Sequence, residues 1–449
     1  MKLVKMSLAA AVMLGASAFA IDNVKVSGDA KVYYSTSESD TNSLDLFDKD
    51  ASAADTALRF GMTADLVKGV SMGVTANAVS TLGLENNLVS NTWTGAHNGV
   101  EDHGWISELW LATTMGKTTA KVGRMELDTP FAFSESWSVA KNTFDAAVLI
   151  NQDIPDTTIV GAWVGKGNGV NHLAPLASVP AVPAVDALID DNKDNRAGVG
   201  LDGFMADKGK FTTYGEKGAY ALAIVNNSFK PLTAQAWYYN VGLVADAYWL
   251  QADINCQIVP GVKIGAQYAN IDPKGKVDMV TETLGAGKAK DSDAYAFKLA
   301  YEGVKNLKVS AAYSDVDEDG VLNIANTATN NLGTAQSKLY TEAWWNYGYV
   351  GAPGAEAYNI TAEYDAGFAK FGAYYTDVEI DNNANAVVNV LNNLGVSRED
   401  GTDMAEFAVT ASKSFGPLDA TLAYISTDAD DQNDGKRYDT LQAYLTLNF

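Results

Sequence analysis

The sequence is poor in the residues that build disulfides and histidine-ligated metal sites. Of its 449 residues, one is a cysteine (Cys256) and three are histidines (His97, His103 and His172). A single cysteine excludes a framework of disulfides within the chain, and we expect this thiol to be a small buried or lipid-facing residue. The histidines fall in segments predicted to be long loops, with no second histidine at metal-ligand spacing on a helix. A barrel phospholipase would need a Ser/His pair on its wall, so the sequence does not predict an enzyme.

Positive charge is also scarce. There are 32 Lys and Arg residues against 55 Asp and Glu residues, which gives a formal net charge of −23. Proteins that bind nucleic acid neutralise phosphates with Lys and Arg. This charge, together with the lack of a glycine-rich phosphate loop, argues against a nucleic-acid partner.

Long apolar runs are missing after the first 20 residues. A transmembrane helix needs about 18 or more consecutive apolar residues, so none is predicted there. A closed β-barrel is the other structure that satisfies every backbone group in lipid, and its strands carry apolar residues only at alternate positions. The missing apolar run therefore leaves a membrane barrel open.

The first 20 residues have the order of a secretory signal peptide. Lys2 and Lys5 form a basic region, an apolar run covers residues 6–14, and small residues end in Ala18-Phe19-Ala20. This order of charge, apolar core and A-x-A predicts cleavage after Ala20. Residues 21–449 contain no linker, so we expect one domain, an outer-membrane β-barrel.

What the sequence does contain is an apolar residue at every second position. In the last segment these residues are Leu441, Ala443, Leu445, Leu447 and Phe449. Alternate side chains of a strand point to opposite faces, so the segment predicts a strand with one lipid-compatible and one hydrated face. Residues 24–34, 58–66, 262–268 and 418–424 alternate in the same way. A soluble sandwich strand could also alternate, but the signal peptide and the final Phe favour a barrel.

Short and long connections alternate along the chain. Tight turns are predicted near residues 67–69, 116–117, 153–156, 228–231, 259–261, 303–306, 365–367 and 415–417, and the largest polar segment runs from about 165 to 218. Short periplasmic turns and long extracellular loops are typical of outer-membrane barrels. Eight turns and nine long loops predict an all-β fold, a transmembrane antiparallel β-barrel of about 18 strands, with 16–18 expected. Residues 219–225 and 232–239 could be paired differently.

Aromatic residues near the predicted strand ends agree with a membrane barrel. Tyr and Trp rings prefer the headgroup level of a bilayer and form girdles there. The residues in question are Tyr34, Trp110, Trp163, Tyr238, Tyr239, Tyr248, Tyr301, Tyr313, Tyr364, Tyr375 and Tyr424.

The hydrated faces of the predicted strands carry charges of both signs. The basic residues are Lys25, Lys31, Arg59, Lys263, Lys298, Lys308 and Lys370, and the acidic ones are Asp29, Asp65, Asp253, Glu363, Glu406 and Asp419. A barrel of about 16–18 strands leaves a water-filled lumen, and rows of fixed charge bias which ions enter it. For each single residue, a hydrated wall without selectivity is the alternative. We therefore predict a porin for passive diffusion of ions and small hydrophilic solutes.

One stretch resembles a known family. The segments GRMELDTPF (residues 123–131), KNTFDA (141–146) and DIPDTTIVGAWV (153–164) are similar to those of campylobacter-type major outer membrane porins, which are akin to the outer membrane porin D group. The resemblance implies an 18-stranded trimeric porin whose third long loop folds inward and narrows the pore.

Carried over residue by residue, the resemblance implies five candidates for the constriction. They are Arg124, Glu126, Asp128, Glu135 and Lys141. One of them departs from the strand pattern, because alternation places Arg124 on the same face as Ala120 and Val122, towards lipid. Either the strand ends or bulges there, or Arg124 lies at the rim.

Two acidic segments are candidates for structural calcium, although no cofactor is expected to be required. Asp315, Asp317 and Asp319 have the D-x-D-x-D-G spacing of a calcium loop, but Asn326 stands where a closing Glu would be. The second segment contains Asp428, Asp430, Asp431 and Asp434. A solvated acidic loop is the alternative for both, while some members of the resembled family bind calcium.

The sequence leaves two classes of function. A porin in the bacterial outer membrane is the prediction, with lipid and lipopolysaccharide around it, the barrel-assembly machinery recognising its C-terminal strand, and a homotrimer implied by the resemblance. Acidic loops at the mouth favour a weak preference for cations, whereas the wall lysines favour anions. The alternative is a surface-exposed structural or adhesive barrel whose lumen is blocked.

Overall fold

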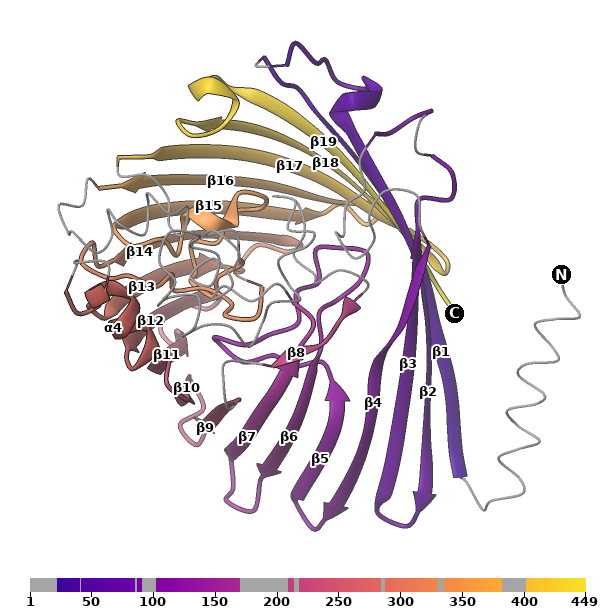
Figure 1. The fold of residues 1–449 in the computed structure, drawn as a ribbon, viewed down its shortest axis with the longest axis vertical. Coiled ribbons are helices and arrows are strands. Elements are labelled where there is room, and N and C mark those ends of the chain that lie inside the picture. Colours follow the sequence, from indigo (N-terminus) through magenta and orange to yellow (C-terminus); the bar gives the residue numbers. More distant parts are fainter. Residues whose placement is uncertain are drawn as a thin grey trace, which may run out of the picture.

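The strands of the protein form one antiparallel sheet that closes on itself. The computed structural model describes residues 22–40, 42–84, 87–90, 102–169, 209–213, 218–283, 287–329, 335–381 and 401–449, so the predicted signal peptide lies outside the described residues. Each strand pairs with its neighbours in the chain, and β1 (Asp22–Ser37) pairs with both β2 (Ser52–Val67) and β19 (Tyr438–Asn448), which completes the barrel (Figure 1).

The remaining strands follow in chain order around the wall. They are β3 (Val70–Ser80), β4 (His103–Met115), β5 (Thr118–Met125), β6 (Phe144–Asn151), β7 (Thr157–Gly167), β8 (Thr212–Thr213), β9 (Ala219–Asn226), β10 (Leu232–Val241), β11 (Ala245–Asn255), β12 (Val262–Pro273), β13 (Ser292–Tyr301), β14 (Leu307–Val316), β15 (Ala355–Asp365), β16 (Lys370–Ile380), β17 (Asp403–Phe415) and β18 (Leu418–Ala429). Because β8 is a two-residue extension paired only with β7, the wall has 18 strands, as predicted. The pairing of β9 with β10 is also as expected.

The described helices are few and belong to the connections between strands. Among the described residues they are α4 (Lys276–Thr283), at the rim in Figure 1, and the short turns η1 (Lys49–Ala51), η4 (Tyr347–Tyr349) and η5 (Asn433–Gly435). None of the described helices is long and apolar enough to cross a membrane.

All eight predicted tight turns join consecutive strands, but the prediction of nine long loops is wrong at one place. Residues 242–244 alone connect β10 to β11 at the long-loop end. Leu243 has a φ of 65°, and the Val244 amide donates to the Val241 carbonyl over 3.0 Å, which closes a tight turn. A tyrosine-rich segment there reads as a continuous strand pair, and the sequence does not show how short its connection is.

The two faces of each strand differ as the alternation predicts. In β1, Val26 and Val32 are exposed on the outside, whereas Asp29 and Tyr33 are buried on the inside. The aromatic girdle follows this rule with two exceptions, because Trp110 and Tyr239 lie on inward-facing positions. On the outer face, tyrosine hydroxyls donate to nearby carboxylates, as from Tyr424 to Asp439 over 2.6 Å. This arrangement fits a ring level with lipid headgroups.

The barrel closes at Phe449. Its amide donates to the Gly28 carbonyl over 3.0 Å, and the Gly28 amide donates to the Phe449 carbonyl over 2.8 Å. The ring of Phe449 lies directly over Gly28, where a Cβ atom would come within 2.7 Å of it. A glycine at this position therefore lets the last residue pack flat on the first strand.

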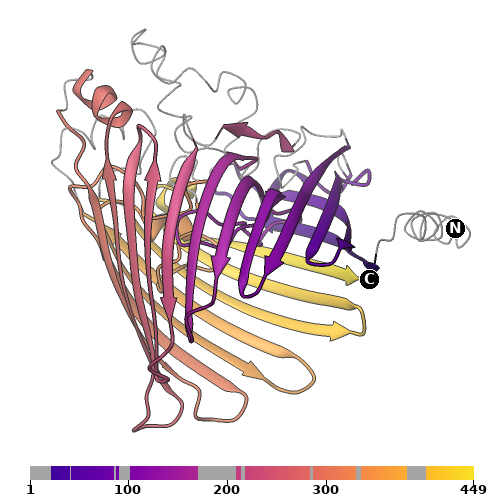
Figure 2. The ribbon, with the colours of Figure 1, turned by 90° about the horizontal axis from the view of Figure 1, so that it is seen from below.

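Two long connections fold into the barrel instead of standing away from it. The first, residues 126–143 between β5 and β6, is called the third loop below. The second, residues 317–354 between β14 and β15, is called the lumen loop. The wall is shorter beside the third loop, where β5, β6 and β9 have eight residues each, and Figure 2 shows this low side of the barrel.

Candidate functional site: two loops inside the barrel

The third loop begins with a chain of opposite charges that joins it to the wall. Glu126 follows directly after β5, and its Oε1 lies 3.3 Å from Arg59 Nη1 while its Oε2 lies 2.7 Å from Lys141 Nζ. Arg59 Nε in turn donates to Asp29 Oδ2 over 2.7 Å. The side chains of Glu126, Lys141 and Arg59 keep about a third of their surface exposed. The structure thus brings three predicted site residues together on the lumen side.

The rest of the third loop is a tight hairpin. The Ser134 amide donates to the Leu127 carbonyl over 2.8 Å, and the Thr129 hydroxyl donates to the Ala132 carbonyl over 2.8 Å. Pro130, between these partners, supplies the fixed φ that a turn needs. This local chemistry explains why the segment turns back instead of extending the strand.

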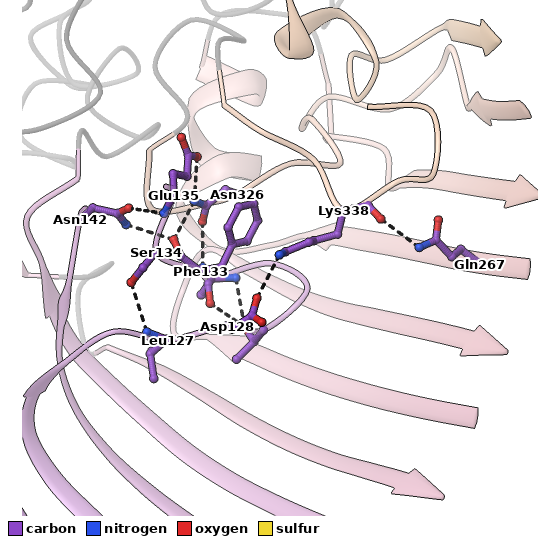
Figure 3. A network of polar contacts seen from close by, with 11 residues as sticks. Leu127, Asp128, Phe133, Ser134, Glu135, Asn142, Gln267, Asn326 and Lys338 are labelled. Atoms are coloured by element: carbon purple, nitrogen blue, oxygen red, sulfur yellow. Dashed lines mark hydrogen bonds and ion pairs between the residues drawn. The ribbon is translucent and has the colours of Figure 1, made fainter. Parts of the chain in front are cut away.

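Asp128 lies on the lumen side of this hairpin and is exposed. Its Oδ1 is 3.0 Å from Lys338 Nζ on the lumen loop, and that ammonium also lies 4.3 Å from the ring centroid of Phe133 (Figure 3). An ion pair this exposed contributes little to stability, about 0–1 kcal/mol. It does place one charge of each sign at the edge where the two loops meet.

Glu135 was predicted to face the pore, and the structure places it elsewhere. It is 1% exposed, and its carboxylate accepts hydrogen bonds from Trp137 Nε1 (2.6 Å), Asn326 Nδ2 (2.9 Å) and the Thr329 hydroxyl. Burial raises the pKa of Glu135, although these hydrogen bonds oppose the shift. A side chain this enclosed anchors the loop and does not touch a passing solute.

Arg124 is a second correction. It does not join the charged cluster, because it lies on the outward-facing side of β5, in register with the exposed Leu109. Its Nε donates to Asp145 Oδ1 over 2.8 Å, and its Nη1 donates to the Ile106 carbonyl over 2.8 Å. The outward position of Arg124 therefore follows from strand alternation. Arg124 does not line the constriction, contrary to what the resemblance implied.

The lumen loop holds the third loop through one asparagine. Asn326 Nδ2 donates to the Phe133 carbonyl over 2.9 Å, and Asn326 Oδ1 accepts from the Phe133 amide over 3.2 Å (Figure 3). The Thr327 amide adds a bond to the Phe131 carbonyl over 2.9 Å. The side-chain amide of Asn326 therefore satisfies both backbone groups of a buried residue in the other loop.

The lumen loop reaches the wall at β11–β13. Gln267 Nε2 donates to the Lys338 carbonyl over 2.9 Å, and the Tyr340 hydroxyl donates to Asp253 Oδ1 over 2.7 Å. Lys298 Nζ lies 4.1 Å from the Tyr340 ring centroid. A Cβ on Gly265 would come within 2.5 Å of the Tyr340 hydroxyl, so this glycine makes room for the loop.

A third attachment joins the lumen loop to β17. Glu406 is 1% exposed and accepts hydrogen bonds from the amides of Trp345 (3.0 Å) and Asn346 (2.8 Å). Asn346 Nδ2 adds a bond of 2.9 Å to the same carboxylate. Glu406 faces the lumen, as its strand position predicts, but it is covered by the loop.

A further buried carboxylate lies within the lumen loop itself. Glu342 Oε2 accepts from the Ser337 amide over 2.8 Å, while Oε1 is buried and has no hydrogen-bond partner within the described residues. Burial raises the pKa of Glu342 well above its ordinary value, and the nearby Glu135 and Glu406 push it in the same direction. Ionising this carboxyl therefore costs more where the loops meet than it does in water.

The lumen loop was not predicted from the sequence, although it leaves a signal there. Residues 321–352 contain two charged residues, Lys338 and Glu342, in a chain whose other loops are strongly acidic. A 32-residue loop in water has no reason to be so apolar, and Ile324, Leu339 and Val350 are buried. A search for weakly charged long loops would have found it.

The remaining predicted basic residues lie on the lumen wall. Lys263 pairs with Glu302 over 2.7 Å, Lys298 contacts Tyr340, and Lys308 is exposed near the short-turn end of β14. They do not join the cluster at Glu126.

The carboxylates of the first acidic segment do not converge in the structure. Asp315 faces outward and accepts from the Tyr295 hydroxyl over 2.7 Å, whereas Asp317 Oδ1 accepts from the Asp319 amide over 2.7 Å. Asp319 itself pairs with Lys290. Within the part of the chain that the structure describes, no three His, Cys, Asp or Glu residues come together to hold a metal.

The second acidic segment is dispersed as well. Asp428 pairs with Arg437 over 3.2 Å, Asp430 Oδ2 accepts from the Asp403 amide over 3.3 Å, and Asp434 lies in η5. These geometries do not fit the predicted calcium sites. His103 begins β4, so the expectation that no histidine falls on a strand is wrong, while His97 and His172 lie outside the described residues.

Comparisons with known proteins agree with this barrel. Residues 1–170 match the family model described as Campylobacter major outer membrane protein. The family resemblance is confirmed over these residues. The matched range includes the third loop but not the lumen loop. No curated protein matches the sequence.

Solved structures share the fold at low sequence identity. The Pseudomonas aeruginosa protein OccK3 (OpdO) superposes with a TM-score of 0.64 at 11% identity, covering 96% of this chain and 97% of that one. The outer membrane protein OpdK from the same organism gives 0.67 at 10% identity, covering 95% and 99%. Acinetobacter baumannii OccAB4 gives 0.67 at 11%, covering 95% and 98%. The chain therefore shares the closed 18-strand barrel fold of these proteins.

Proposed function

We propose that this outer-membrane barrel is a porin whose lumen is narrowed by the third loop and the lumen loop acting together. The observation that carries the proposal is the chain Asp29–Arg59–Glu126–Lys141 on the lumen side, of which Arg59, Glu126 and Lys141 are partly exposed. A wall of about 16–18 strands encloses a channel wider than its side chains can fill. The family match supports the same function.

The charge arrangement suits weak ion selectivity. Opposite charges alternate along this chain, so no single sign dominates the aperture, and a small hydrophilic solute of either charge finds a partner. The acidic extracellular surface attracts cations to the mouth over about 10 Å at 0.1 M salt. We therefore expect a weak preference for cations at low salt.

Planar lipid bilayers test the proposal. Purified protein should give steady unitary steps whose size follows the conductivity of the bulk salt. Passive diffusion of uncharged sugars into liposomes should stop above a sharp size limit. If correctly folded barrel gave neither unitary conductance nor sugar uptake, the proposed porin function would be contradicted.

A blocked structural or adhesive barrel is the second candidate, and the buried residues of the lumen loop favour it. That loop is attached to the wall at two separate places, at Gln267 on β12 and at Glu406 on β17. If these contacts seal the lumen, the protein conducts nothing, and replacing the lumen loop creates the conductance. Wild-type conductance therefore decides between the two functions.

We further propose a homotrimer assembled through the low side of the wall. An apolar groove of about 450 Å³ lies on the outer face there, between the exposed Leu111, Val122 and Leu149. The Arg124–Asp145 ion pair faces outward beside it, and such a pair is costly in lipid but acceptable against protein or headgroups. Native mass spectrometry should show three copies, and V122K should reduce this to one, whereas L422K on another part of the wall should not.

Assembly is proposed to depend on Phe449, which the barrel-assembly machinery would recognise at the end of the last strand. Deleting Phe449 removes both backbone bonds to Gly28. We expect protease-sensitive periplasmic protein and loss of the heat-modifiable form, with unchanged transcription. Normal outer-membrane levels would contradict this.

Cleavage after Ala20, contact with lipopolysaccharide and calcium binding stay predictions, and no catalytic activity is proposed.

A further inference from the structure

A cavity of about 620 Å³ lies at the short-turn end of the lumen, between the strands β14–β17 and the lumen loop. Its lining includes Lys308, Glu363, Lys370, Trp344, Tyr374 and Thr410. Short turns face the periplasm in outer-membrane barrels, so a solute that has passed the two loops reaches this cavity next. A volume in the range of about 300–1,000 Å³ is typical of small-molecule sites.

Two aromatic rings form one side of the cavity. The ring centroids of Trp344 and Tyr374 are 4.9 Å apart, with their planes tilted by 32°. Trp344 is held in place because the next two residues of the lumen loop donate their amides to Glu406. A Cβ on Gly372 would lie 2.5 Å from the Tyr374 hydroxyl, so the glycine lets this ring lie against the wall.

The cavity also presents charges of both signs that are available to a ligand. Lys308 and Lys370 are exposed, and neither is in an ion pair with a described carboxylate, in contrast to Lys263, which pairs with Glu302 over 2.7 Å. Glu363 is exposed as well, and it accepts a hydrogen bond of 3.2 Å from the Tyr374 hydroxyl. In the sheet, Glu363 is in register with Lys308, so the opposite charges are neighbours.

We propose that this cavity binds a small zwitterion with an apolar side chain, of the class of free α-amino acids. The carboxylate of the solute lies between Lys308 and Lys370, its ammonium faces Glu363, and its side chain packs against Trp344 and Tyr374. This inference rests on the proposed function in one respect, because it treats the cavity as a binding site on the path of a solute that diffuses through the channel. Binding at such a place is weak, since the solute has to leave again.

Charge on the ligand separates this proposal from a simple anion site. Phenylalanine, N-acetylphenylalanine and phenylalaninamide share one side chain but are a zwitterion, an anion and a cation. Isothermal titration calorimetry with folded protein in detergent measures their binding without any need for conduction. We expect phenylalanine to bind about tenfold more tightly than the other two, since losing one ionic partner costs roughly that factor.

Substitutions assign the contacts. K308Q and K370Q should each weaken phenylalanine and N-acetylphenylalanine, whereas E363Q should weaken phenylalanine and phenylalaninamide. W344L should weaken all three ligands. K25Q is the matched control, because Lys25 faces the lumen on β1, outside the cavity, and it should bind like the wild type.

Two results would overturn the proposal. One is equal binding of N-acetylphenylalanine and phenylalanine together with an unaffected E363Q, which describes an anion site. The other is no binding of any of the three ligands to folded, heat-modifiable protein. Neither of these results would change the conductance of the channel. A protein that bound phenylalanine but did not conduct would instead contradict only the proposed porin function.

Discussion

The two loops inside the barrel reach the lumen by different means. The third loop is connected to the wall by partly exposed ion pairs, through Glu126 to Arg59 and Lys141. The lumen loop is connected by buried hydrogen bonds, through Glu406 on the wall and Asn326 to the third loop. From this difference we infer that the third loop supplies charge to the aperture, while the lumen loop holds the third loop in position.

The free energies of the two kinds of contact also indicate that the lumen loop is the main support. Exposed ion pairs contribute about 0–1 kcal/mol each, whereas hydrogen bonds to a buried charged group contribute about 1.5–3 kcal/mol. Glu135 and Glu406 each accept three hydrogen bonds at 1% exposure. The position of the third loop should therefore depend on the lumen loop more than on its own ion pairs.

The largest expected effect of a point substitution is at Asn326. In N326A the amide of Phe133 loses its partner, whereas its carbonyl keeps a hydrogen bond from Asn142 Nδ2, and leaving a buried group unsatisfied costs about 1–3 kcal/mol. We expect a lower midpoint temperature for loss of the heat-modifiable form and larger noise in the open-channel current. Asn323, buried in the same loop with no side-chain hydrogen bond among the described residues, supplies the control N323A. Equal effects of the two substitutions would mean that the hydrogen bonds of Asn326 do not specifically hold the third loop.

A smaller effect is expected from pH, and it should act on the lumen loop. Burial raises the pKa of Glu342, so its docked carboxyl binds a proton more tightly than the same group in water. Docking is therefore firmest below the ordinary pKa of a glutamate and weakens as the pH rises through the raised value. Current noise should grow with pH in the wild type.

The variant E342Q isolates this contribution. Because glutamine does not titrate, the rise of noise with pH should flatten. E302Q, which removes a carboxylate paired with Lys263 on the wall, should keep the wild-type profile. A profile in E342Q identical to that of the wild type would assign the pH dependence to another group.

The smallest effect is expected at the third loop itself. E126Q leaves Arg59 and Lys141 with one fewer negative partner, so the lumen becomes more positive at the aperture. Reversal potentials under a KCl gradient should move towards anions, with little change in stability. D419N, near the short turn between β17 and β18, should move them less. No shift in E126Q would place the selectivity at the acidic mouth and not at this cluster.

Much of the wall could be predicted from the sequence, because a strand in lipid leaves a period of two. The turns, the strand number and the inward position of Arg59, Lys298 and Lys308 all follow from that period. The exception at residues 242–244 arose because the length of a connection leaves no periodic trace in the sequence.

The site itself was only partly predictable. The resemblance gave the inward third loop, but it could not tell that Glu135 is enclosed, because enclosure is produced by Asn326 and Thr329, nearly 200 residues away. For Arg124, the strand pattern was the better guide than the resemblance. The lumen loop lies outside the matched range and was recognisable only by its lack of charge.

The central claim is that the lumen loop is the main support of the constriction, and unitary conductance tests it most directly. Asp315 and Glu356 are paired across β14 and β15, so a short Gly-Ser turn can replace residues 319–352 without opening the wall. A second variant shortens the third loop between Leu127 and Ser134, which are already hydrogen-bonded. We predict that the first variant raises the conductance several-fold and the second raises it less. A larger increase from shortening the third loop, with the lumen loop intact, would contradict the account.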